Sequence, residues 1–100
     1  MVMRGTVSLV IFDQEGYILE KFTMGEGESI SAVEMTPNTW HTVFPTSDSA
    51  VIFEAKEGPY APAKPSDFAS WPPKEGSDHV PTFQTWLENA KAGDLYRQVI

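Results

Sequence analysis

The sequence predicts an all-β domain of antiparallel strands followed by a proline-rich segment and one C-terminal helix. Three features indicate this fold. Short runs rich in β-branched and aromatic residues recur in the first half of the chain, turn-forming residues separate these runs, and apolar residues at helical spacing occur near the C-terminus. We therefore expect one domain spanning residues 1–100, with strands in 1–56, a proline-rich strap in 57–80 and a helix in 81–92.

The composition limits the classes of function. The 100 residues are 41% hydrophobic, carry a net charge of −7 and include no cysteine. The acidic balance repels nucleic acid and anionic membrane surfaces, and the lack of cysteine excludes disulfides, zinc-thiolate sites and a cysteine nucleophile. The sequence contains no apolar run of about 18 residues and no basic-then-apolar start. We expect a cytoplasmic protein without nucleic-acid or membrane partners.

The first two strands are expected to form a hairpin. Residues 6–12 and 17–24 are strand-like, and the turn at 13–16 ends in Gly16, which can adopt positive φ. Centring the hairpin on this turn brings three pairs of apolar side chains opposite each other. The predicted pairs are Phe12 with Tyr17, Val10 with Leu19, and Val7 with Phe22.

The next strands are expected to carry the most reactive pair of side chains. In residues 29–35 the side chains alternate between two faces, which predicts a third strand. A turn follows at 37–39, and the pattern of residues 40–45 and 50–56 predicts a second hairpin. This register places His41 opposite Glu54 and Val43 opposite Ile52.

The strap is rich in proline, and the spacing of apolar residues predicts the helix. The strap also contains Tyr60, Phe68 and Trp71, aromatic residues of the kind that pin an extended segment to a sheet. The helix has apolar residues three and four apart from Phe83 to Ala90, and Gly93 can end it in the left-handed conformation. Residues 94–100 are expected to form a loose tail.

Three segments carry a resemblance to a known family. They are VEMTPNTWHTV at 33–43, VIFEAKEGPY at 51–60 and DFASWPPKEG at 67–76. Together they resemble the WbuC family of cupin-fold metalloproteins, which are bacterial proteins found with surface-polysaccharide genes. The resemblance implies a cupin-like antiparallel β-barrel or half-barrel of the jelly-roll type, and a role with a sugar-related small molecule.

Two departures from the family pattern affect the expected metal site. The family carries an upstream first motif with two closely spaced histidines and a glutamate, and we expect this chain to lack it, with residues 1–5 standing where that motif ends. Asn38 and Thr36 occupy a family glycine and a family proline position. Asparagine tolerates the left-handed conformation, so we expect the turn geometry to persist while the full ligand set is lost.

His41 matches the one histidine that the family's second motif contributes to metal. Glu34 and Glu54 are the candidate partners, and one imidazole with two carboxylates can form a facial site for a divalent iron, manganese, nickel or zinc ion. The alternative is a half-buried structural histidine hydrogen-bonded to Glu54, with no metal bound by the single chain.

Aromatic residues are the candidates for ligand binding. Trp40, Phe44, Tyr60 and Trp71 can line a pocket for a sugar or another flat ligand. The alternative is that these rings, with Phe68, are core residues and strap anchors.

These observations support three hypotheses about the function. The first is a degenerate, non-catalytic binding or structural module that self-associates as a homodimer or higher oligomer, because an incomplete barrel leaves an open sheet edge and an uncovered apolar face. The second is a metal-dependent cupin enzyme, an isomerase or oxygenase acting on a sugar nucleotide, with a site shared between subunits. The third is an accessory subunit that completes its barrel with a longer chain.

Overall fold

The computed structural model describes residues 1–55, 71–73 and 80–96. Five strands and one helix occur in these ranges, in agreement with the expected all-β class. They are β1 (Val2–Arg4), β2 (Thr6–Phe12), β3 (Ile18–Gly25), β4 (Trp40–Pro45), β5 (Val51–Ile52) and α1 (Val80–Asn89).

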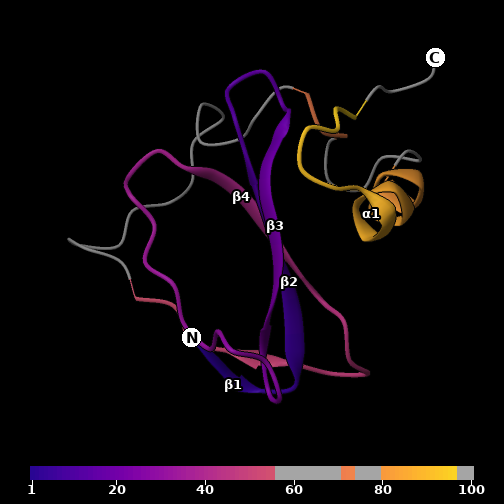
Figure 1. Cartoon of the computed structure of the whole chain (residues 1–100). Helices are drawn as coiled ribbons and strands as arrows, with labels where there is room; N and C mark the ends of the chain where they lie inside the picture. The colour runs from indigo at the N-terminus through magenta and orange to yellow at the C-terminus, as the bar shows by residue number, and fades with distance from the viewer. Residues whose placement is uncertain (56–70, 74–79, 97–100) are drawn as a thin grey trace.

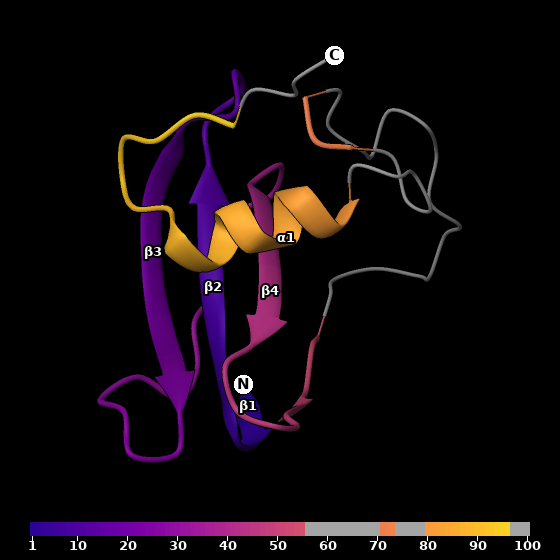
Figure 2. The ribbon, with the colours of Figure 1, turned by 90° about the vertical axis from the view of Figure 1, so that its right-hand side faces the viewer.

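The strands form two separate antiparallel sheets. One has three strands in the order β3-β2-β4, and the other is a two-stranded ribbon of β1 and β5. The ribbon lies at one end of the larger sheet (Figure 1). Helix α1 crosses one face of the three-stranded sheet (Figure 2).

The central strand β2 is buried on both faces and organises the core. Val10 and Phe12 pack toward the helix, against Leu87 and Ala90. Leu9, which directly precedes Val10 in sequence, belongs to a second cluster on the opposite face. The continuous apolar run at residues 9–12 is typical of a strand that is covered on both sides, since each face then receives every second side chain.

The expected register of the first hairpin is wrong for two reasons. The connecting loop extends through Tyr17, so that Phe12 pairs with Ile18, and a bulge then inserts an extra residue in β3. The observed pairs are Val7 with Met24, Leu9 with Phe22, Val10 with Lys21, Ile11 with Glu20 and Phe12 with Ile18, with the irregularity between Ile11 and Phe12. Leu19 therefore has no partner on β2, and its side chain is 54% exposed. The turn itself is held by Asp13, whose side-chain oxygen accepts the backbone N–H groups of Glu15 and Tyr17 at 2.9 Å.

The expected strand at 29–35 does not form. This segment is largely exposed and meets the sheets through two backbone hydrogen bonds, from Val2 N–H to Ser31 O at 2.8 Å and from Gly25 N–H to Ile30 O at 2.9 Å. Alternation alone does not make a strand when neither face of the segment is buried.

The expected hairpin between residues 40–45 and 50–56 is also wrong. Strand β4 pairs with β2, so His41 lies opposite Ile11 and not opposite Glu54, while the two-residue β5 pairs with β1. Pairing with β2 packs alternate residues of β4 against the helix-side core. Ser47 turns the chain out of the sheet, since its hydroxyl accepts the Thr6 N–H at 3.0 Å and donates to Ser49 O at 2.7 Å.

The C-terminal helix is confirmed, with shifted ends. It spans Val80–Asn89 in place of 81–92, and Gly93 beyond it has the expected positive φ of 93°. The expected loose tail is wrong for residues 94–96, because Leu95 bridges to Tyr17 and Tyr96 is buried. Within the described ranges, no helix is long and apolar enough to cross a membrane.

Most of the strap, with Tyr60 and Phe68, lies outside the described residues, as do residues 97–100. Trp71 is described and packs on Phe12 with 4.6 Å between ring centroids. The prediction that an aromatic residue of this segment anchors it to the sheet is therefore confirmed for Trp71.

Candidate functional site

His41 lies on β4 with its side chain on the face of the sheet that α1 does not cover. Its cross-strand neighbour is Ile11, which packs with the core cluster on that face. Residues directly opposite in an antiparallel pair project to the same side, so the imidazole shares the side of Ile11. The residue is exposed, in contrast to the half-buried position that the structural alternative required.

The tautomer of His41 follows from its hydrogen bond. Nδ1 lies 3.0 Å from the carbonyl oxygen of Thr39. A carbonyl oxygen only accepts, so Nδ1 carries the proton, and in the neutral ring Nε2 then presents a lone pair. The same arrangement, in which one ring nitrogen donates to a carbonyl, is common in histidines that bind metals through the other nitrogen.

The turn before His41 has the geometry that the sequence predicted. Asn38 has φ of 65° and is the one non-glycine residue with positive φ in the described chain. The Thr39 hydroxyl donates to Thr36 O at 2.7 Å, closing the turn from the other side. These two residues hold the Thr39 carbonyl, and therefore the ring of His41, in place.

The structure does not bring the proposed metal ligands together. Glu34 and Glu54 are both exposed. Among the residues that the structure describes, no three His, Cys, Asp or Glu side chains lie close enough to hold a metal ion. Glu34 instead lines an open hollow of about 400 Å³ between the end of β2 and the turn at 36–39. The donor set on these residues does not fit a metal ion held by one chain, so an ion at His41 would need ligands from elsewhere.

The aromatic residues proposed for ligand binding have a packing role where they are described. Trp40, Phe44 and Trp71 are partly buried against the cluster of Val10, Phe12, Ile18, Leu87 and Ala90. This placement corresponds to the core-and-anchor alternative. Tyr60 lies outside the described residues.

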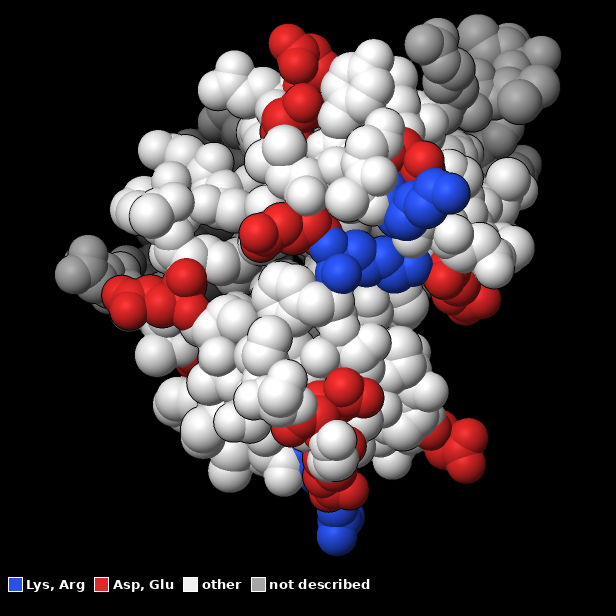
Figure 3. Space-filling view, viewed as in Figure 1, with Lys and Arg blue, Asp and Glu red and all other residues white. Residues whose placement is uncertain are grey.

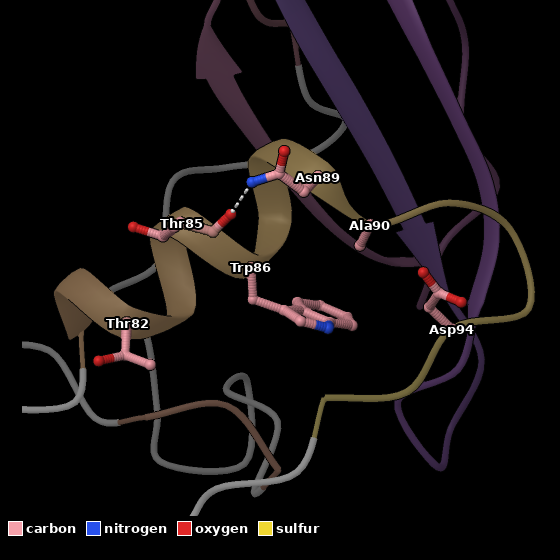
Figure 4. A pocket seen from close by; sticks show the side chains of 6 residues that line it. All are labelled: Thr82, Thr85, Trp86, Asn89, Ala90 and Asp94. Atoms are coloured by element: carbon pink, nitrogen blue, oxygen red, sulfur yellow. Dashed lines mark hydrogen bonds between the residues drawn. The ribbon is translucent and has the colours of Figure 1, made fainter.

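A second hollow lies beside the helix and was not anticipated from the sequence. It has a volume of about 480 Å³ and lies between α1 and the segment that follows it. Figure 4 shows the indole of Trp86 projecting from the helix toward the segment that carries Asp94. The spacing of Thr82, Thr85 and Asn89 along one side of the helix is a sequence signal that could have identified it. The lining residues are Thr82, Thr85, Trp86, Asn89, Ala90 and Asp94.

The ribbon of β1 and β5 presents an apolar outer face. Met1 and Phe53 exchange backbone hydrogen bonds of 2.9 and 2.8 Å, so their side chains lie side by side. Met1, Met3, Val51 and Phe53 are 52%, 58%, 52% and 58% exposed, respectively. Val2, which alternates with the two methionines, packs into the core on the opposite side of the ribbon. We call these four exposed residues the ribbon face.

Charge is unevenly distributed over the part of the chain that the structure describes. On the side seen in Figure 3, acidic side chains are spread over much of the surface, while most of the basic ones gather near the middle. The described residues include 10 of the 14 acidic and 3 of the 7 basic residues of the sequence. The described residues on this side therefore carry an excess of negative charge, which repels anionic ligands.

Comparison of the chain with protein-family models, with curated proteins and with solved structures found no match. Its function is therefore inferred from the geometry of the described residues and from the chemistry of the sequence.

Proposed function

We propose that this chain is a cupin-like binding or structural module for sugar-related small molecules, that it catalyses no reaction of its own, and that it self-associates. The observation that supports the proposal is the ribbon face. Four large apolar side chains at one end of the molecule, each 52% to 58% exposed, form a surface of the kind that self-association buries.

The small size of the ribbon of β1 and β5 also favours association with a second copy. Strands β1 and β5 pair with each other, and β5 contributes two residues. An isolated two-stranded ribbon is marginally stable in water. Packing a second copy on the ribbon face would remove apolar surface from water at about 25 cal/mol per Å² and would cover the ribbon on both sides.

The charges at the ribbon ends suit a two-fold arrangement. Arg4 is exposed at the end where it pairs with Val51, and Glu54 is exposed beyond the other end, next to the pair of Met1 and Phe53. A two-fold axis through the ribbon face would place Arg4 of each copy near Glu54 of the other. The interface would then be electrically balanced although each chain carries a net charge of −7.

Light scattering after size-exclusion chromatography tests this proposal. We expect a dimer at micromolar concentration, and we expect Phe53→Glu to produce a monomer because it places a carboxylate on the ribbon face. Leu19→Glu is the matched control, since Leu19 is 54% exposed but lies on β3, outside the ribbon. A monomeric wild-type protein, or equal disruption by both substitutions, would contradict the proposal.

One observation favours a second candidate, a metal-dependent enzyme with a site shared between subunits. The hydrogen bond from Nδ1 of His41 to Thr39 O, at 3.0 Å, orients Nε2 as a ligand would require. In this candidate His41 supplies one ligand to an iron, manganese, nickel or zinc ion, and a second copy supplies others.

Elemental analysis of protein purified without an affinity tag separates the two candidates. The enzyme candidate predicts near-stoichiometric metal that His41→Ala removes and that His79→Ala, at the other histidine of the sequence, leaves in place. Metal-free protein that still dimerises would support the first proposal alone.

A further inference from the structure

We infer that the hollow beside α1 binds an uncharged, hydroxyl-rich ring such as a pyranose sugar, stacked on the indole of Trp86. This inference deepens the proposed binding role and rests on it. It assigns that role to residues of α1 and of the segment that follows it (Figure 4), none of which belongs to the His41 turn or to the ribbon face.

Trp86 is a rigid platform. Its ring lies 5.9 Å from the Phe83 ring at an interplanar angle of 20°, and 5.3 Å from the Tyr96 ring at 59°. Phe83 and Tyr96 are themselves 4.7 Å apart in an edge-to-face pair, and Tyr96 is buried. One part of the indole is therefore fixed by aromatic neighbours, while the part that lines the hollow remains available to a ligand. A platform that is already immobile loses little entropy on binding.

The polar groups around the platform mainly accept hydrogen bonds. Asn89 donates from Nδ2 to Thr85 O at 2.9 Å, which leaves its side-chain oxygen as an acceptor. Asp94 accepts the Lys91 N–H at 2.9 Å through Oδ2, so that Oδ1 is a second acceptor. The Thr85 hydroxyl donates its proton to Pro81 O at 3.1 Å and keeps its lone pairs. A ligand matching this rim must supply several donors.

The charge and the positions of these acceptor groups discriminate between classes of ligand that donate hydrogen bonds. Phosphate and carboxylate groups mainly accept hydrogen bonds, and their negative charge would meet the Asp94 carboxylate on a chain of net charge −7. A compact cation would use one carboxylate and one ring face. The acceptors here belong to three residues, with two on the helix and Asp94 across the hollow, an arrangement that suits hydroxyl groups distributed around a ring.

The size of the hollow fits this class of ligand. Its volume of about 480 Å³ lies within the range of about 300–1,000 Å³ that is typical of small-molecule sites. The lining residues that the structure describes come from one helix face and one short segment, so their contacts hold the ligand on one side. We therefore expect weak binding, with a Kd in the millimolar range, of a single ring or of the end of a chain.

Amide and indole N–H signals in two-dimensional NMR spectra provide the test. The probes are the methyl glycosides of glucose, galactose and mannose, each added up to about 50 mM, which is well above the expected Kd. Trp86→Phe identifies the Trp86 indole signal by its loss. We expect at least one glycoside to move this signal saturably, together with amide signals near Asn89 and Asp94.

Two substitutions on the same helix connect the effect to the hollow. Asn89→Ala should raise the Kd by about fivefold or more, because it removes one acceptor. Gln84→Ala is the control, because it removes a side-chain amide from an exposed position of α1 outside the lining and should leave the Kd unchanged.

Three results would overturn the inference. They are no saturable shift with any of the three glycosides, equal weakening by Asn89→Ala and Gln84→Ala, and a saturable shift with choline chloride in place of the glycosides, which would indicate a cation site. Light scattering on the same samples keeps the two proposals separate. If the glycosides leave the Trp86 signal unmoved in a protein that still dimerises, the sugar site is wrong and self-association stands.

Discussion

Lys21 of β3 holds the C-terminal end of α1, with its Nζ 2.6 Å from the carbonyl oxygen of Leu87. The same ammonium group donates to Glu88 O at 3.0 Å and to Ala90 O at 2.8 Å. Carbonyls at the end of a helix lack partners within the helix and carry its partial negative charge. A lysine at this position donates hydrogen bonds to these carbonyls, and its positive charge is attracted to the negative end of the helix. One side chain thus connects two elements that lie 66 residues apart in the sequence.

Replacing Lys21 with methionine should destabilise the protein by about 1–3 kcal/mol, because the carbonyls at the helix end lose their charged donor while most of the apolar stem is retained. Urea denaturation followed by circular dichroism measures the change. Lys91→Met, at an exposed position just beyond the helix, is the control and should change stability by less than about 0.5 kcal/mol. Equal effects of the two substitutions would show that the three hydrogen bonds contribute nothing specific.

Two glycine substitutions separate backbone strain from steric conflict. Gly16 and Gly27 have φ of 98° and 79°, so alanine is strained at either position. A Cβ on Gly16 would lie 2.8 Å from Cδ2 of Trp71, whereas one on Gly27 would meet no atom within 4 Å. Trp71 is packed on Phe12 and cannot retreat freely. We expect Gly27→Ala to cost about 1–2 kcal/mol and Gly16→Ala at least about 1 kcal/mol more, measured by thermal unfolding. Equal losses of stability in the two variants would mean that Trp71 does not pack against the turn at Gly16.

Two serines should respond oppositely to replacement by alanine. The Ser8 hydroxyl is buried and has no hydrogen-bond partner among the described residues, while that of Ser47 bonds to the backbone of Thr6 and Ser49. Removing an unsatisfied buried hydroxyl relieves its desolvation cost, so Ser8→Ala should leave stability unchanged or raise it by about 1 kcal/mol. Ser47→Ala should lower it by about 1–2 kcal/mol. A loss of stability in Ser8→Ala would indicate that its hydroxyl does find a partner.

A pair of leucine substitutions tests the register of β2 and β3. Leu9 is 1% exposed in the centre of β2, whereas Leu19 is 54% exposed at the bulge. Leu9→Ala should cost about 2–5 kcal/mol through lost burial and the cavity that it leaves, and Leu19→Ala less than about 0.5 kcal/mol. Chemical denaturation measures both. A large cost at Leu19 would favour the regular hairpin in which it faces Val10.

Local features of this protein were predictable from the sequence, because they depend on a few adjacent residues. The run at Thr6–Phe12 became the central strand, and Asn38, Gly16 and Gly93 all adopted positive φ. The helix appeared where apolar residues recur three and four apart. Backbone sterics and side-chain periodicity act within one element, so their effects can be read without knowing what packs against it.

Features that join distant segments were decided by the tertiary structure. Burial determined that β4 pairs with β2, and this choice moved His41 away from Glu54 and placed it opposite Ile11. The bulge at Leu19, the capping of α1 by Lys21 and the hollow around Trp86 also depend on residues far apart in the chain. Strand partners are selected by which side chains leave water together, and that quantity is a property of the whole fold.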